Sequence, residues 1–222
     1  MRVRYFYSRD RSRLYLSATA EEFDGRPLLQ TVWFEGVNGE LNHEAVCLAA
    51  WLIFAPFVSY RLKFEKPVLR PLVDQIVRTW GAPLEIMQVD EQPKAYPKRQ
   101  GSLVIVSPYA SADQLMKACV TQPIYQLEEL PLSASGTVFL NNRIQFKSNV
   151  RLHESTAGGQ MVYASMAAAI VYADYMSIQN IACRKKLLDA APPTMVGCED
   201  EHEAAWVELL KHAGFNLLVS DV

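Results

Sequence analysis

Several signatures of common protein classes are missing from this sequence of 222 residues. Its four cysteines include no C-x-x-C pair, which argues against a disulfide framework. The N-terminal "MRVRYFYSRD" has no apolar signal core. The longest apolar runs, residues 45–58 and 161–173, fall short of the roughly 20 residues that a membrane helix needs. We therefore expect a cytoplasmic protein without a membrane partner.

Signatures of catalysis are missing as well. No serine lies in a G-x-S-x-G elbow, and no Walker lysine follows the glycine-containing loop. The acidic cluster at residues 198–203 includes His202, but no second histidine or cysteine lies at metal-ligand spacing, so it is interpreted as the start of a helix. The sequence predicts no cofactor and no metal.

Positive charge is also scarce, since the formal net charge is -2. This argues against a broad nucleic-acid-binding surface. The N-terminus is the local exception, because five arginines there face one acid, Asp10. These arginines are Arg2, Arg4, Arg9, Arg11 and Arg13. We interpret the segment as a solvated pair of strands, with a contact to nucleic acid as the alternative.

Strand and helix patterns alternate along the chain. Period-two or β-branched segments predict strands at residues 3–8, 13–18, 28–36, 58–64, 84–89, 102–108 and 216–220, and a hairpin about Asn141 and Asn142. Apolar residues at helical spacing predict helices at residues 43–55, 67–81, 111–120, 161–188 and 201–215. Asn42 is the expected N-cap of the first helix, and Gly214 ends the last one. The mixture predicts an α/β or α+β fold, a mixed sheet with flanking helices.

The polar stretch "DEQPKAYPKRQG" contains two prolines and is the best candidate for a linker. We therefore predict an N-terminal α+β subdomain at residues 1–92, a linker at 93–101 and an α/β subdomain at 102–222. A single compact domain is the alternative.

Two loops carry the candidate site residues. The first precedes the apolar helix at residue 161 and contains Ser155, Thr156, Gly158, Gly159 and Gln160. Its glycines allow a phosphate to approach the N–H groups at a helix start. Its Gly-Gly-Gln is similar to that of peptide release factors, but their basic downstream segment is absent. A simple helix-capping turn is the plainest alternative.

The second loop follows the buried strand at residues 102–108. In an open parallel sheet, ligands bind beyond the carboxyl ends of the strands, which makes Ser107, Ser111 and Asp113 candidates. His153, next to the glycine loop, is the candidate acid or base.

The second loop also resembles the "S-G-G-x-D-S" loop of 7-cyano-7-deazaguanine synthase-like proteins, with Ser107 and Asp113 at matching places. The similarity covers about residues 30–118, mostly by pattern, and implies an ATP-pyrophosphatase site. Pro108 and Tyr109 replace both glycines, however, and proline supplies no N–H to a phosphate. The zinc-binding cysteines of the synthases are absent too. The resemblance therefore implies a degenerate loop and a structural or partner-binding role.

Two functions remain. The first is a non-catalytic subunit of a cytoplasmic complex, or a homo-oligomer, with part of residues 50–58 and 163–176 at an interface. The alternative is an enzyme that binds a nucleotide or phosphometabolite through both loops. Tryptophans 33, 51, 80 and 206 are interpreted as core anchors rather than platforms for bases.

Overall fold

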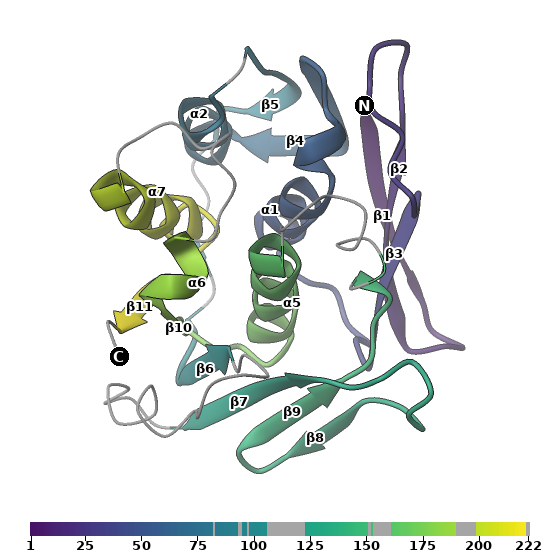
Figure 1. Ribbon diagram of the computed structural model, residues 1–222, viewed down its shortest axis with the longest axis vertical. Coiled ribbons are helices and arrows are strands. Elements are labelled where there is room, and N and C mark those ends of the chain that lie inside the picture. The colour runs from purple at the N-terminus through teal and green to yellow at the C-terminus, as the bar shows by residue number, and fades with distance from the viewer. Residues whose placement is uncertain are drawn as a thin grey trace.

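Two mixed β-sheets and their flanking helices form the molecule, which confirms the α/β or α+β class (Figure 1). The computed structural model describes residues 1–81, 83–92, 95–96, 98–105, 123–150, 152, 161–189 and 199–220. The first sheet uses strands from before residue 91, and the second uses strands from after residue 101. The subdomain boundaries and the linker at 93–101 stay predictions.

The first sheet has the strand order β3-β2-β1-β4-β5. These strands are β1 (Arg2–Ser8), β2 (Arg13–Thr19), β3 (Thr31–Glu35), β4 (Arg61–Leu69) and β5 (Glu85–Asp90). The strands β1, β2 and β3 pair antiparallel, whereas β4 and β5 join in parallel. Side chains alternate along β2 and β3, so that every second residue is buried beneath the sheet.

The second sheet has the order β11-β10-β6-β7-β9-β8. Its strands are β6 (Ser102–Ile105), β7 (Ile124–Glu129), β8 (Val138–Leu140), β9 (Arg143–Phe146), β10 (Asn180–Arg184) and β11 (Asn216–Ser220). All pairs are parallel except β8 with β9, the hairpin predicted about Asn141 and Asn142. All four residues of β6 are buried, as expected for a strand covered on both faces.

The described helices are α1 (His43–Phe54), α2 (Arg70–Thr79), α5 (Met161–Tyr175), α6 (Lys185–Asp189) and α7 (Glu199–Lys211), with a short 3₁₀ turn at Ala55–Phe57. Asn42 caps α1 as predicted, because its side chain accepts a hydrogen bond from the N–H of Glu44. The helix expected from the acidic cluster at residues 198–203 begins at Glu199.

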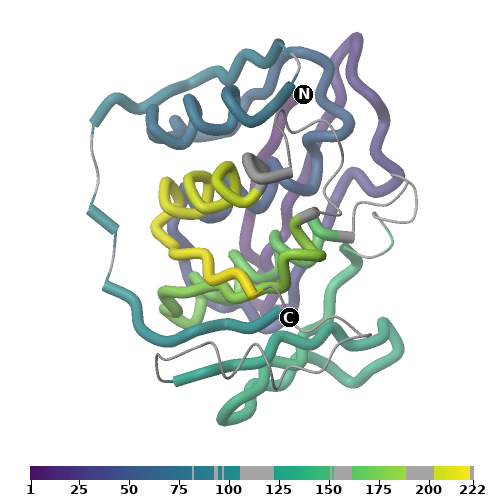
Figure 2. The backbone as a smooth tube through the Cα atoms, turned by 60° about the vertical axis from the view of Figure 1, so that its left-hand side comes forward, coloured from purple at the N-terminus to yellow at the C-terminus, as the bar shows by residue number. Residues whose placement is uncertain are grey.

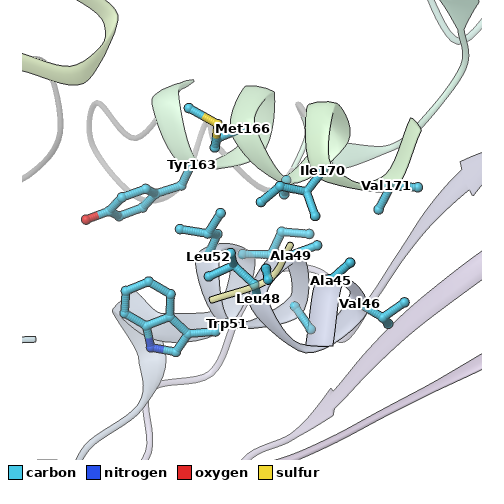
Figure 3. Close-up of a cluster of buried hydrophobic side chains, with 14 of the residues drawn as sticks. Ala45, Val46, Leu48, Ala49, Trp51, Leu52, Tyr163, Met166, Ile170 and Val171 are labelled. Atoms are coloured by element: carbon cyan, nitrogen blue, oxygen red, sulfur yellow. The ribbon is translucent and has the colours of Figure 1, made fainter. Parts of the chain in front are cut away.

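The core lies where α1 packs against α5, between the two sheets (Figures 1 and 3). Leu48 and Leu52 of α1 face Tyr163 and Ile170 of α5, and these side chains are buried. One continuous core cluster includes these helices and residues of both sheets. The apolar segments at residues 50–58 and 163–176 therefore fill the chain's own interior. The expectation that part of them lies at an interface stays a prediction.

A buried ion pair holds the segment before β6 against α5, and its carboxylate also reaches the start of α1 in the first half of the chain. The guanidinium of Arg99, just before β6, pairs with Asp174 near the end of α5. The second carboxylate oxygen of Asp174 accepts a hydrogen bond from the N–H of Asn42, 2.6 Å away. Arg99 also donates to the carbonyl of Gly214 at 2.5 Å and lies 4.1 Å from the ring centre of Phe215. The segment after residue 94, expected to be a polar linker, is therefore anchored by a buried side chain.

Gly214 lies close against this ion pair. Its φ is +87°, and a Cβ there would lie 2.7 Å from Nη1 of Arg99. The predicted end of the last helix thus coincides with a close approach that only glycine permits.

Two expectations about secondary structure are wrong. The apolar stretch at residues 161–188 is not one helix, because α5 ends at Tyr175 and β10 follows from Asn180. Strand β7 was not expected at all, since "IYQLEE" shows little alternation. Strand β10 is buried in a parallel sheet, where a continuous apolar run resembles a buried helix and periodicity does not distinguish the two.

Candidate ligand site at the carboxyl edge of the second sheet

The order of the parallel strands reverses once in the second sheet. From β6 the chain adds β7 and then β9 on one side, and later adds β10 and β11 on the other side of β6. If the five parallel strands are numbered 1 to 5 in chain order, their order across the sheet from β9 to β11 is 3-2-1-4-5. This is the strand order of doubly wound sheets. The reversal falls between β6 and β10, which pair directly with Ser102 opposite Asn180. Ligands of such sheets bind beyond the carboxyl ends of these two strands.

Three basic residues follow one another at this edge. Strand β10 ends at Arg184, and α6 begins with Lys185 and Lys186. Arg184 and Lys185 are half-buried, whereas Lys186 is exposed. Strand β6 ends beside them at Ile105. The reversal point therefore carries positive charge that suits an anion.

Helix directions bring further N–H groups toward the same edge. α5 ends five residues before β10 begins, and α7 ends five residues before β11 begins. Each helix leads into the amino end of a strand, so its own N-terminus points toward the carboxyl edge (Figure 2). A helix N-terminus favours an anion through its free N–H groups and its dipole.

The residues predicted as a site lie outside the described residues. They are Ser107, Ser111, Asp113, His153, Ser155, Thr156, Gly158, Gly159 and Gln160. Their flanking elements are described, however. The loop that contains Ser107 starts where β6 ends at Ile105, and the glycine-containing loop ends where α5 begins at Met161. Both of these chain positions belong to the carboxyl edge, which is the arrangement that a shared site requires. The site residues themselves stay predictions.

The basic residues Arg184, Lys185 and Lys186 were missed because this stretch was assigned to a helix. The signal in the sequence is the change from the apolar "NIAC" to "RKK", which marks the end of a buried strand.

Cys183, the residue before Arg184, contributes no reactive thiol to this edge. Its side chain is fully buried, and burial raises the pKa of the thiol to about 12. A thiol with this pKa stays protonated at neutral pH and packs as a small apolar side chain.

A second polar cluster lies at the start of α1. The hydroxyl of Tyr5 lies 3.1 Å from Nδ1 of His43, and Sγ of Cys47 lies 3.5 Å from its Nε2. Burial lowers the pKa of His43 and raises that of Tyr5. Cys47 is 1% exposed, so this thiol is closed to a substrate. His43 therefore packs and bonds locally.

Two hollows occur among the described residues. One of about 250 Å³ is lined by Asp24, Ser59 and neighbouring residues of the first sheet. The other, about 320 Å³, lies near the amino ends of β6 and β7, beside Lys98, Gln100 and Tyr125. In the described part of the chain, no three histidine, cysteine or acidic residues group as a metal site would. Neither hollow adjoins the reversal point.

No family model, curated protein or solved structure matches the chain. None of the helices within the described ranges is long and apolar enough to cross a membrane. The strand order and the residues at its reversal are therefore the features from which a function can be inferred.

Proposed function

We propose that this protein binds a phosphate-bearing small molecule of the nucleotide class at the carboxyl edge of its second sheet. The observation that carries the proposal is the reversal of strand order between β6 and β10. In sheets of this order, the connections that follow the two strands at the reversal run in opposite directions. This leaves a crevice between them in which the ligand binds.

Charge supports a phosphate at this position. Lys185 and Lys186 open α6 directly beyond β10, and Arg184 ends the strand. The predicted serines, with Ser107 the nearest in sequence to β6, would add hydroxyl donors. The N-terminus of α5 points toward the same edge and would add backbone N–H donors, whereas α7 begins with its own acidic residues, Glu199, Asp200 and Glu201.

Binding is proposed here rather than cleavage of ATP. Pro108 removes one backbone N–H from the loop, and Tyr109 replaces a residue that in the resembled family lets the backbone wrap a pyrophosphate. A kinship with 7-cyano-7-deazaguanine synthase-like proteins thus stays a proposal about ancestry. The ligand-binding edge does not depend on it.

A thermal-shift screen with ATP, GTP and sugar phosphates tests the proposal. A ligand at 100 times its dissociation constant adds about 2.7 kcal/mol to the free energy of unfolding. We expect stabilisation by at least one of these compounds, and a weaker response in Lys185→Glu. Lys211→Glu, at the far end of α7, is the control for a change of charge alone. No shift with any compound, or equal shifts in all three proteins, would contradict the proposal.

A second candidate function is self-association through strand β8. All three residues of this edge strand are exposed, and Val138, Phe139 and Leu140 are apolar. An uncovered apolar edge strand pairs readily with another strand. Pairing β8 with its copy in a second molecule would give a two-fold antiparallel contact.

Light scattering after size exclusion tests this second candidate. We expect twice the mass of one chain, and the mass of one chain for Leu140→Lys. Leu28→Lys changes a leucine away from β8 that is even more exposed than Leu140, and it should leave the mass unchanged. A single-chain mass for the unsubstituted protein across micromolar concentrations would reject it.

A further inference from the structure

The open face of the first sheet carries a row of three aromatic side chains. Phe6 lies opposite Tyr15 across β1 and β2, and Tyr15 lies opposite Trp33 across β2 and β3. The rings of Phe6 and Tyr15 stack at 4.8 Å with 5° between their planes. Phe6 is 49% exposed. Cross-strand partners point to the same face, so the row spans three strands.

This row includes Trp33, which was expected in the core. Trp51, Trp80 and Trp206 are buried as predicted, but Trp33 is only half-buried. The guanidinium of Arg13 lies 4.0 Å from the centre of its ring and pairs with Glu35. The outward position follows from strand alternation, since Val32 and Phe34 on either side point inward.

Positive charge lies beside the aromatic row on the same face. Arg2 and Arg4 precede Phe6 at intervals of two and are exposed, and Lys63 lies opposite Arg2 on β4. Within the described ranges, no ion pair forms at Arg4 or Lys63, and Arg2 contacts Glu21 only at 3.9 Å. Arg9 and Arg11 are exposed at the hairpin turn between β1 and β2. The arginine cluster noted in the sequence thus follows the aromatic row along one strand and its turn.

Most acidic side chains around this face already form ion pairs. Glu35 pairs with Arg13, and Glu85 pairs with Arg61 at 2.9 Å. Glu65 on β4 is exposed and is the acidic side chain nearest in register to Arg4. The basic groups without partners therefore outnumber the acidic ones beside Phe6.

The described helices leave this face uncovered. They pack on the opposite face of the sheet, where Val3, Leu14 and Leu16 join the core (Figure 1). The pairing of β1 with β4 ends at Val3 and Phe64. The side of the Phe6 ring away from Tyr15 therefore has no strand partner in register.

From this combination we infer that the open face of the first sheet binds single-stranded nucleic acid. Aromatic side chains stack on bases of any sequence, and neighbouring cations contact the phosphates. A base would stack on the open side of Phe6, and Arg2, Arg4 and Lys63 would contact phosphates on either side of it. Paired bases are already stacked on each other, so a duplex cannot use Phe6 in this way. The site is separate from the ligand edge of the second sheet and does not rest on the proposed function there.

Fluorescence anisotropy with labelled twelve-nucleotide oligouridine and oligothymidine measures this binding directly. We expect binding at 50 mM salt that weakens as salt rises. Each phosphate contact in a single strand contributes about 0.7 to the slope of log affinity against log salt, so three contacts predict a slope near -2. A twelve-base-pair duplex should bind more weakly. A preference for the uridine over the thymidine strand would identify RNA as the natural class.

Two variants and two controls locate the site. Phe6→Leu keeps an apolar side chain but loses the ring, and we expect an affinity about tenfold lower, the size of one lost base stack. Arg2→Glu with Arg4→Glu should abolish measurable binding. Phe23→Leu, at another exposed aromatic, and Arg143→Glu, on the second sheet, should change nothing. Circular dichroism melts confirm that each variant is folded.

Two outcomes would overturn the inference. One is no binding of either strand at 50 mM salt. The other is binding that persists in both Phe6→Leu and the double arginine variant, which would place the contact elsewhere. A co-purifying protein that protects Phe6 from solvent would also count against it, because that protein would occupy the same face.

Discussion

The two sheets of this protein differ in how their faces meet solvent. The first sheet buries one face against the helices and exposes the other, so buried and half-buried residues alternate along β2 and β3. The second sheet buries both faces of β6 and β10, which read as continuous apolar runs. An open face can offer a broad surface to a polymer. A sheet covered on both sides offers only its edge, where a small ligand binds.

The tryptophans show what this difference means for single residues. Trp51 on α1 and Trp80 at the end of α2 meet edge to face with ring centres 5.8 Å apart inside the core. Trp33 has similar apolar neighbours in sequence but lies on the open face, because strands turn every second side chain outward. The face to which a residue belongs therefore matters more than the apolar character of its neighbours.

We expect the largest loss of stability from a substitution at the buried ion pair of Arg99 and Asp174. Arg99→Ala would leave the buried carboxylate of Asp174 without its cation and should lower the free energy of unfolding by about 3–5 kcal/mol. Urea denaturation followed by circular dichroism measures the change. Because the carboxylate of Asp174 also accepts a hydrogen bond from the N–H of Asn42 before α1, we also expect the unfolding of the two sheets to become less cooperative.

The control for this prediction is an exposed ion pair. Arg143 and Glu128 lie 3.7 Å apart, and both side chains are 45% exposed. Arg143→Ala should change the free energy of unfolding by about 0.5 kcal/mol at most. Equal effects of the two substitutions would show that the buried ion pair of Arg99 contributes no more to stability than an exposed one.

A cavity at the α1–α5 contact should have the next largest effect. Leu48 is fully buried between these helices, so Leu48→Ala should cost about 3 kcal/mol (Figure 3). Leu28 is 61% exposed, and Leu28→Ala serves as the matched control with little expected effect. Differential scanning calorimetry would show whether one transition persists in Leu48→Ala. If only part of the protein melted early, the two sheets would not share one core.

A substitution at Asn180, where the parallel strands of the second sheet begin, should have a smaller and more local effect on stability. Nδ2 of Asn180 donates to the carbonyl of Gly101 at 3.1 Å and to Oγ of Ser102 at 3.2 Å, while its Oδ1 accepts from Asn216 at 3.0 Å. These bonds align the first residues of β10, β6 and β11. Asn180→Ala should cost about 1–3 kcal/mol, because buried polar partners lose their bonds.

Hydrogen exchange would test where the Asn180→Ala effect is confined. We expect faster exchange in β6, β10 and β11 and unchanged exchange in β1 and β2. Faster exchange in both sheets to the same degree would mean that Asn180 does not act locally on the parallel strands.

The sequence was sufficient for the first sheet and for most helices, because alternation and caps are local signals. Asn42, Pro56 and Gly214 mark helix ends through their own backbone chemistry. Strand β10 was missed because it is almost fully buried and therefore lacks a period of its own. Strand β7 was missed because its mixed polar and apolar residues show little alternation.

The candidate ligand site was only partly accessible to sequence reasoning. Loops that follow a buried strand or precede a glycine-rich helix start can be recognised locally. Whether they belong to one edge depends on strand order, which is set by contacts between residues far apart in the chain. Arg184 and Lys185 became candidates only when β10 was found beside β6.

The smallest effect is expected from His43, beneath the first sheet. Burial lowers the pKa of this imidazole, so the folded protein binds fewer protons than the unfolded chain below the ordinary histidine value near 6.5. The contribution of His43 to the free energy of unfolding should therefore be constant above pH 6.5 and fall as the pH drops below that value. The groups facing His43 are Tyr5, Glu44, Cys47 and Lys66, and they remain in His43→Gln. Urea denaturation at pH 7 and pH 5 should show a smaller loss of stability in His43→Gln than in the unsubstituted protein. An equal loss in both would mean that His43 is protonated as readily in the folded state as in the unfolded one, and that the inner face of the first sheet is more hydrated at α1 than its packing indicates.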